Sequence, residues 1–205
     1  MKIDKAAAWA WRMLLVLSLF LLAGQTKAIA DDEIMAPKGF VLQSLDPTDG
    51  LIARPKNWFY QSHGTASGWL WIISAEDPTK GSYETGLRIQ MLVGIQKGTG
   101  LTTEAFARNY LNQKRQEGQI LKDCPDSDVG QFQRHCIESI EADSQPGHQG
   151  EKLHILTTVS WGKSMDMVVV SIFGAPDRNW DQVAPIADVM AKYRLLGPNF
   201  GKPKS

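Results

Sequence analysis

The stretch Met165-Asp-Met-Val-Val-Val-Ser-Ile-Phe173 is apolar at every position except Asp166 and Ser171. Successive side chains of a strand point to opposite faces of its sheet, so a strand of this composition is apolar on both faces. Such strands occur where other layers cover the sheet on both sides. We therefore predict a central strand over residues 165–173, with covering elements on each face.

Outward from this strand, neighbouring segments alternate between apolar and polar residues, which is typical of strands with one wet face. Residues 87–95 place Arg88 and Gln90 opposite a row of apolar side chains. Residues 46–50 contain proline, aspartate and glycine and indicate a turn between two short strands. The strands that we expect before residue 165 cover residues 40–45, 51–54, 68–75, 87–95, 120–121, 131–141 and 153–161.

Two segments have the apolar spacing of amphipathic helices. In residues 102–116, Thr102 or Thr103 can cap the start, and Glu104 suits the positive end of the helix dipole. Residues 180–193 contain Pro185, which belongs in the first turn of a helix or produces a kink. Runs of strands with two separated helices indicate an α+β fold, in which helices flank an antiparallel β-sheet.

The first thirty residues have the organisation of a secretory signal, with a basic start, an apolar run and small residues ending at Ala30. The apolar run reaches only about 16 Å as a helix, well short of a hydrocarbon core of about 30 Å. Gln25 occupies the position at which a bacterial lipidation box has its cysteine, so no lipid anchor is expected. We predict a cleaved signal at 1–30, a loose leader at 31–39, one domain at 40–197 and a polar tail at 198–205.

Cys124 and Cys136 are the two cysteines of the chain. An even number of cysteines in an exported protein favours a disulfide, because exported compartments are oxidising. The pair lacks the Cys-x-x-Cys spacing of redox motifs, and two unpaired buried thiols are the alternative. We predict a Cys124–Cys136 disulfide that stabilises the fold by about 3 kcal/mol.

The composition is that of an ordinary globular protein, with 43% hydrophobic residues and 22 basic residues balanced by 22 acidic ones. This balance excludes the basic footprint of a nucleic-acid-binding domain. The sequence has no phosphate-binding loop, no dinucleotide-binding glycine motif, no serine-nucleophile elbow and no His-Glu-x-x-His motif. We therefore predict no catalytic residues, no metal site and no cofactor.

The four histidines are interpreted as surface residues, because they do not occur at metal-ligand spacing. If the apolar faces of residues 131–141 and 153–161 point to one core, His135 and His154 both face outward. A pairing of Ile140 with Leu153 would then place them about 13 Å apart along the strands, too far to share one metal ion.

Acidic residues provide two further, less favoured candidates for a functional site. Asp123, Asp126 and Asp128 surround Cys124 and could bind calcium weakly, although a solvated acidic turn is the favoured interpretation. Asp166 is either a buried acid with a raised pKa or, as is more usual, a residue at the exposed end of a strand. A pocket that joins His63, Asp166 and a hydroxyl group within hydrogen-bond reach would favour an enzyme.

Trp69 and Trp71 lie on the same face of the strand expected at residues 68–75. They could stack on a sugar or a peptide, and we name them as speculative ligand-binding residues. Bulky aromatic residues on strands more often fill the space beneath a helix, so the core interpretation is favoured.

The order of the expected elements resembles the PsbP-like family and the bacterial DcrB-like proteins. In these proteins an early strand runs into a Pro-x-x-Trp segment, which Pro55-Lys-Asn-Trp58 matches here. The resemblance covers most of residues 40–197. It implies an α-β-α sandwich around an antiparallel sheet, in a family whose members mostly act as accessory or binding proteins.

These observations together lead us to expect an exported, non-catalytic accessory or interaction protein of the cell envelope, periplasmic or secreted and not lipidated. Its expected partner is another envelope or exported protein. Nucleic acid and stable membrane insertion after signal cleavage are not expected. The alternatives are a protein that binds a glycan, peptide or metabolite and, less favoured, an enzyme of an unrecognised type.

Overall fold

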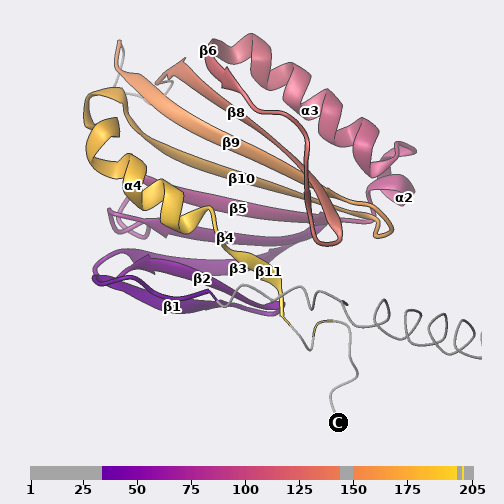
Figure 1. The fold of residues 1–205 in the computed structure, drawn as a ribbon, viewed down its shortest axis with the longest axis horizontal. Coiled ribbons are helices and arrows are strands. Elements are labelled where there is room, and N and C mark those ends of the chain that lie inside the picture. The colour runs from indigo at the N-terminus through magenta and orange to yellow at the C-terminus, as the bar shows by residue number, and fades with distance from the viewer. Residues whose placement is uncertain (1–33, 144–149, 198–199, 201–205) are drawn as a thin grey trace, which may run out of the picture. The chain divides into compact units, whose positions relative to one another are not determined.

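The computed structural model describes residues 34–143, 150–197 and 200. The predicted signal, residues 31–33 of the leader and most of the polar tail lie outside the described residues. The main element is an antiparallel sheet of eight strands in the order β3-β4-β5-β10-β9-β8-β6, with β7 paired to β8 (Figure 1). Its strands are β3 (Phe59–Thr65), β4 (Gly68–Ser74), β5 (Gly86–Val93), β6 (Gly118–Asp123), β7 (Ser127–Val129), β8 (Phe132–Ala142), β9 (Lys152–Gly162) and β10 (Met167–Pro176).

The strand β10 lies in the middle of this order, between β5 and β9, as the apolar stretch at residues 165–173 predicted. Val168 and Val170 belong to the hydrophobic core on one face of the sheet, and Val169 and Phe173 belong to the core on the other. Each of these four side chains is at most 5% exposed. The position of β10 therefore confirms the prediction of a central strand that is covered on both faces.

One face of the sheet is covered by α3 (Thr103–Glu117), which follows the short helix α2 (Ile95–Thr99) (Figure 1). Thr102 caps α3 as predicted, because its hydroxyl oxygen accepts a hydrogen bond from the backbone nitrogen of Ala105 at 3.1 Å. The buried residues of this face form one core: Ile95, Ala107, Leu111, Ile137, Val159, Trp161, Val168 and Val170.

The other face is covered by α4 (Trp180–Met190), which follows the 3-10 helix η1 (Asp177–Asn179), and by a second sheet. This second sheet has the order β1-β2-β11, with β1 (Phe40–Leu45), β2 (Asp49–Pro55) and β11 (Arg194–Leu196). Pro185 lies inside α4. The core of this face includes Leu45, Ile52, Trp71, Ile73, Ile89, Phe173, Ala187 and Met190. The antiparallel sheet with helices on both faces confirms the predicted α+β class.

Five elements lie outside the predicted ones: β3, α2, β7, η1 and β11. The strand β3 is an edge strand with five exposed residues, so it lacks the apolar alternation that marks a half-buried strand. The second helix is shorter than the predicted residues 180–193. It ends at Met190, and the chain then returns to pair Arg194 with Leu51 of β2. In the described part of the chain, no helix is long and apolar enough to cross a membrane.

Candidate functional site

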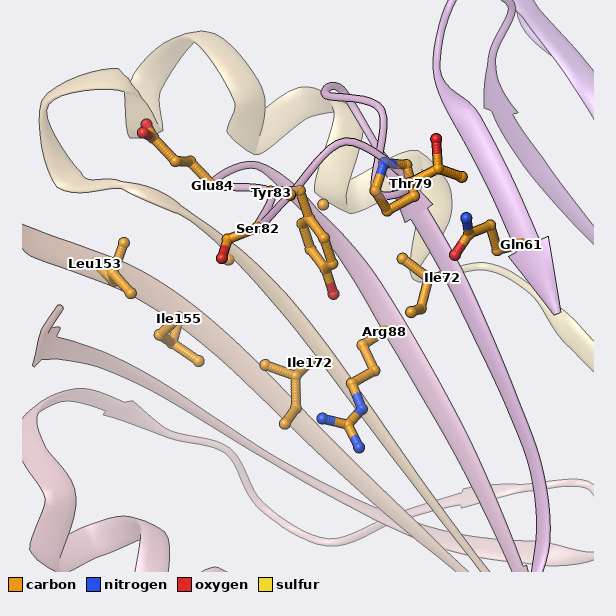
Figure 2. A pocket seen from close by; sticks show the side chains of 14 residues that line it. Gln61, Ile72, Thr79, Ser82, Tyr83, Glu84, Arg88, Leu153, Ile155 and Ile172 are labelled. Carbon is orange, nitrogen blue, oxygen red and sulfur yellow. The ribbon is translucent and has the colours of Figure 1, made fainter. Parts of the chain in front are cut away.

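A pocket of about 830 Å³ opens on the sheet face that also carries α3, and we call it the sheet-face pocket (Figure 2). Its floor follows a row of directly paired residues across four strands: Gln61, Ile72, Arg88 and Ile172. Paired residues in a sheet point to the same face, so these four side chains stand next to one another in the pocket. Leu153 and Ile155 of β9 extend the floor.

Two glycines pair directly across β5 and β10 in the floor of the pocket. Gly86 and Gly174 are register partners and contribute no side chains to the floor. A Cβ atom on Gly174 would lie 2.8 Å from the Cδ1 atom of Ile155, and one on Gly86 would lie 2.6 Å from the backbone oxygen of Ile73 and 3.0 Å from the ring of Tyr83. The absence of side chains here thus lets Ile155 and Tyr83 lie close to the sheet at the edge of the pocket.

The loop between β4 and β5 forms a wall of the pocket. The carboxylate of Glu76 holds this loop, because it accepts hydrogen bonds from the backbone nitrogens of Thr85 at 3.1 Å and Glu84 at 3.3 Å. The backbone nitrogen of Ala75 donates to the carbonyl of Thr85 at 2.9 Å and closes the base of the loop. These bonds position Tyr83 over the sheet, where Figure 2 shows its hydroxyl end near Arg88 and Ile172.

The polar groups of the pocket are few and stand beside an apolar floor. Burial raises the pKa of the Tyr83 hydroxyl, so this group is a neutral hydrogen-bond donor at physiological pH, and the positive charge of Arg88 opposes the shift. Arg88 donates a hydrogen bond to Gln90 Oε1 at 3.1 Å. An apolar floor with a few placed polar groups is the usual chemistry of a small-molecule site.

Trp69 and Trp71 do not line this pocket. Trp71 is completely buried on the opposite face of the sheet, and its indole nitrogen donates to the carbonyl oxygen of Asp46 at 2.8 Å. Trp69 is half-buried against the same core. The speculative platform of two tryptophans is therefore wrong for Trp71, which is part of the core and cannot reach a ligand.

His135 and His154 are buried, with exposed fractions of 8% and 6%, so their interpretation as surface residues is wrong. The register also differs by one residue from the trial pairing, because Ile140 pairs with His154 and not with Leu153. A shift of one residue moves a side chain to the other face of the sheet, so His135 lies on the side of α3 and His154 on the side of α4. Both histidines are buried because other elements cover both faces of the sheet.

His135 lies inside a network of charges between α3 and the segment that follows β6. Its Nδ1 atom is 2.8 Å from Asp126 Oδ1, and its Nε2 atom is 2.6 Å from Asp123 Oδ1. Arg115 binds both carboxylate oxygens of Asp123, at 2.8 and 3.2 Å, and Arg108 binds Asp126 at 2.8 Å. Because these contacts engage both Asp123 and Asp126, we assign the two aspartates to a structural network.

Acidification is expected to weaken this network. Arg115 lowers the pKa of Asp123 and Arg108 lowers that of Asp126, with His135 adding to both effects. A carboxyl group with a lowered pKa in the folded state stabilises the fold above its unfolded pKa of about 3.9, and this contribution is lost as the pH falls through the folded pKa. The double variant Asp123→Asn, Asp126→Asn should therefore be less stable than the parent protein near neutral pH, and the difference should shrink at about pH 3.

Urea unfolding at a series of pH values measures this prediction, and the double variant Asp46→Asn, Asp49→Asn is a control in a different part of the fold. A difference in stability that stays constant down to about pH 3 would show that the carboxylate charges of Asp123 and Asp126 contribute nothing.

His154 is held in the same manner on the other face. Its ring stacks on Trp180 with centroids 3.7 Å apart and an angle of 3° between the planes. Its Nε2 atom is 2.7 Å from Glu138 Oε1, and its Nδ1 atom is 3.3 Å from Asp177 Oδ1. This stack joins the start of α4 to β9, which indicates a structural role.

The remaining residues that sequence analysis singled out are dispersed. Asp166 is exposed, and its Oδ1 atom accepts a hydrogen bond from the backbone nitrogen of Gln96 at 2.9 Å in the first turn of α2. Its place at the exposed end of a strand agrees with the favoured interpretation. His63 is exposed on β3, and Asp128 pairs with Lys163. His148 lies outside the described residues.

Cys124 and Cys136 lie at disulfide distance, with Cα atoms 5.1 Å apart, and link the end of β6 to β8. Among the residues that the structure describes, no group of three or more histidine, cysteine, aspartate or glutamate side chains is arranged to hold a metal ion.

The sequence matches no family model and no curated protein. The solution structure of cyanobacterial PsbP from Synechocystis sp. PCC 6803 matches 85% of this chain and 99% of its own, with 10% identity and a TM-score of 0.45. The chain resembles PsbP in fold.

Two crystal structures match to a similar extent. LpqN of Mycobacterium tuberculosis, which is involved in cell envelope biogenesis, matches 77% of this chain and 92% of its own, with 9% identity and a TM-score of 0.47. The Pseudomonas aeruginosa protein PA94, of unknown function, matches 80% and 99%, with 12% identity and a TM-score of 0.42.

Proposed function

We propose that this protein is an exported, non-catalytic accessory protein of the cell envelope that binds a small amphipathic ligand in the sheet-face pocket. The observation that supports the proposal is the pocket itself, about 830 Å³ in volume and floored by isoleucines beside Arg88, Tyr83 and Gln61. The envelope location follows from the export signal predicted at residues 1–30.

The chemistry of the lining residues favours binding. A nucleophile and a general base within hydrogen-bond reach are the signature of hydrolytic and transfer sites. The described lining residues include serine, threonine and tyrosine hydroxyls, but the two buried histidines are engaged elsewhere, in networks with carboxylates. The apolar area of the floor can instead bury a hydrocarbon or aromatic group, with about 25 cal/mol gained per Å² removed from water.

Filling the pocket tests this function. In the variant Gly174→Val, a side chain is added to the floor, where the atom within 4 Å of the new Cβ is the flexible end of Ile155. The matched control is Gly98→Val on α2, where the new Cβ atom meets no other atom within 4 Å. The probe is 11-(dansylamino)undecanoic acid, whose fluorescence increases when the dansyl group leaves water.

We expect the parent protein and the Gly98→Val variant to bind the probe with the same affinity, and the Gly174→Val variant to bind it at least about tenfold more weakly. Circular dichroism melting shows whether each variant is folded. Equal binding by all three folded proteins, or no binding by the parent protein, would contradict the proposed function.

A further inference from the structure

We infer that the ligand of the sheet-face pocket carries a negative charge, and that Arg88 is the residue that binds this charge. The inference rests on the proposed function, since it concerns the ligand of the same pocket. It assigns a chemical class to that ligand: a single-chain amphiphile with an anionic end, such as a carboxylate.

Arg88 stands in the floor of the pocket, on β5. Its direct partners on the two neighbouring strands are Ile72 and Ile172, so a guanidinium group stands in an otherwise apolar part of the row. The aliphatic stem of an arginine can pack along such side chains while its charged end stays accessible. Figure 2 shows the guanidinium of Arg88 beside Ile172, facing the pocket.

The charge of Arg88 is not balanced by an ion pair in the described part of the chain. Its side chain hydrogen-bonds to the neutral amide of Gln90. Arg108, Arg115 and Arg178 each bind a carboxylate at 2.7–2.9 Å. Arg54 and Arg134 bind neutral groups, as Arg88 does, but of these arginines only Arg88 lines the pocket. Arginine binds carboxylates through two parallel hydrogen bonds, so an uncompensated guanidinium in a pocket is suited to an anionic ligand.

The carboxylate that lines the pocket does not fill this role. Figure 2 shows Glu84 pointing away from Arg88, on the other side of the pocket. Glu84 instead acts on Arg178, whose pKa is raised chiefly by Glu151 and to a smaller extent by Glu84. The pocket therefore has a positively charged end at Arg88.

A tyrosine hydroxyl group reinforces this end. Tyr83 reaches it from the loop between β4 and β5. Burial raises the pKa of this hydroxyl, and the charge of Arg88 acts on it in the opposite direction. The hydroxyl thus remains protonated near neutral pH and can donate a hydrogen bond to an anion.

The test compares two probes of the same shape, 11-(dansylamino)undecanoic acid and its uncharged methyl ester, on the full protein. The variants are Arg88→Gln and the control Arg134→Gln, since Arg134 lies on β8 and pairs with Ser160 on the opposite face of the sheet. Circular dichroism confirms that each variant is folded.

We expect the parent protein and the Arg134→Gln variant to bind the acid about tenfold or more tightly than the ester. The Arg88→Gln variant should bind the two probes equally, with its affinity for the ester unchanged. Equal affinity of the parent protein for acid and ester, or a preference that survives in Arg88→Gln, would overturn the inference and leave the proposed function intact. A parent protein that binds neither probe would overturn both.

Acetate separates this ligand class from a free anion, because acetate carries the carboxylate without the chain. We expect acetate in large excess to leave the bound probe in place. Displacement of the probe by acetate would show that the pocket binds small free anions, and it would overturn the assignment to an amphiphile.

Discussion

Replacing Trp71 with alanine is expected to lower the free energy of unfolding by about 3–5 kcal/mol, the range for removing a fully buried aromatic side chain. Trp71 is 0% exposed and packs in the core between the large sheet, α4 and the second sheet. The variant also removes the hydrogen bond from the indole nitrogen to the carbonyl of Asp46. Chemical denaturation monitored by far-ultraviolet circular dichroism measures the change.

The matched control is Trp69→Ala on the same face of the same strand. Trp69 is only half-buried, so its removal leaves a smaller cavity and should cost clearly less stability than the loss of Trp71. Equal losses for the two variants, or an unchanged stability of Trp71→Ala, would contradict the core assignment and reopen the interpretation of these residues as a ligand platform.

Removing the link between Cys124 and Cys136 has the second largest expected effect. Closing a loop with a sequence separation of 12 residues stabilises a protein by about 3 kcal/mol in the loop-entropy model. The double variant Cys124→Ser, Cys136→Ser should therefore lose about this amount in denaturation experiments.

Reduction of the parent protein with a phosphine reductant should produce the same loss, and the double variant should not respond to the reductant. Free-thiol labelling of the unfolded, unreduced protein shows whether the bond is present. Two titratable thiols, or identical stability with and without reductant, would contradict the predicted disulfide.

The elements of the fold could be predicted from the sequence where burial or capping requires a regular pattern of residue types. The apolar stretch at residues 165–173 lies in the middle strand, and Thr102 caps the mid-chain helix. The strand β3 escaped prediction because its residues after Gln61 are exposed, so no apolar alternation reveals it. The strand β11 has three residues and exists through its pairing with β2, which is distant in the sequence.

The histidines show how strongly a site depends on register. The alternation of residues in β8 and β9 was visible in the sequence, but the register differs by one residue from the trial pairing of Ile140 with Leu153. That single residue decides which face each histidine occupies. It places the two imidazoles on opposite faces, and both are buried because other elements cover each face.

The sheet-face pocket could be predicted only in part. The sequence placed Arg88 and Gln90 on the wet face of their strand, which is a correct partial signal. The pocket itself is lined by Gly86 and Gly174, which pair directly although they are 88 positions apart, and by the loop that carries Tyr83. No local pattern encodes a contact of this kind, so the site emerges only when the strands are assembled.

The most direct test of the account is to locate the bound probe by nuclear magnetic resonance. We expect a titration of the isotope-labelled protein with 11-(dansylamino)undecanoic acid to shift the signals of Ile72, Arg88 and Ile172, and to leave those of Trp71 and His154 on the opposite face unchanged. Shifts that map to the opposite face, or no shifts at saturating probe, would contradict the central claim that the sheet-face pocket is the binding site.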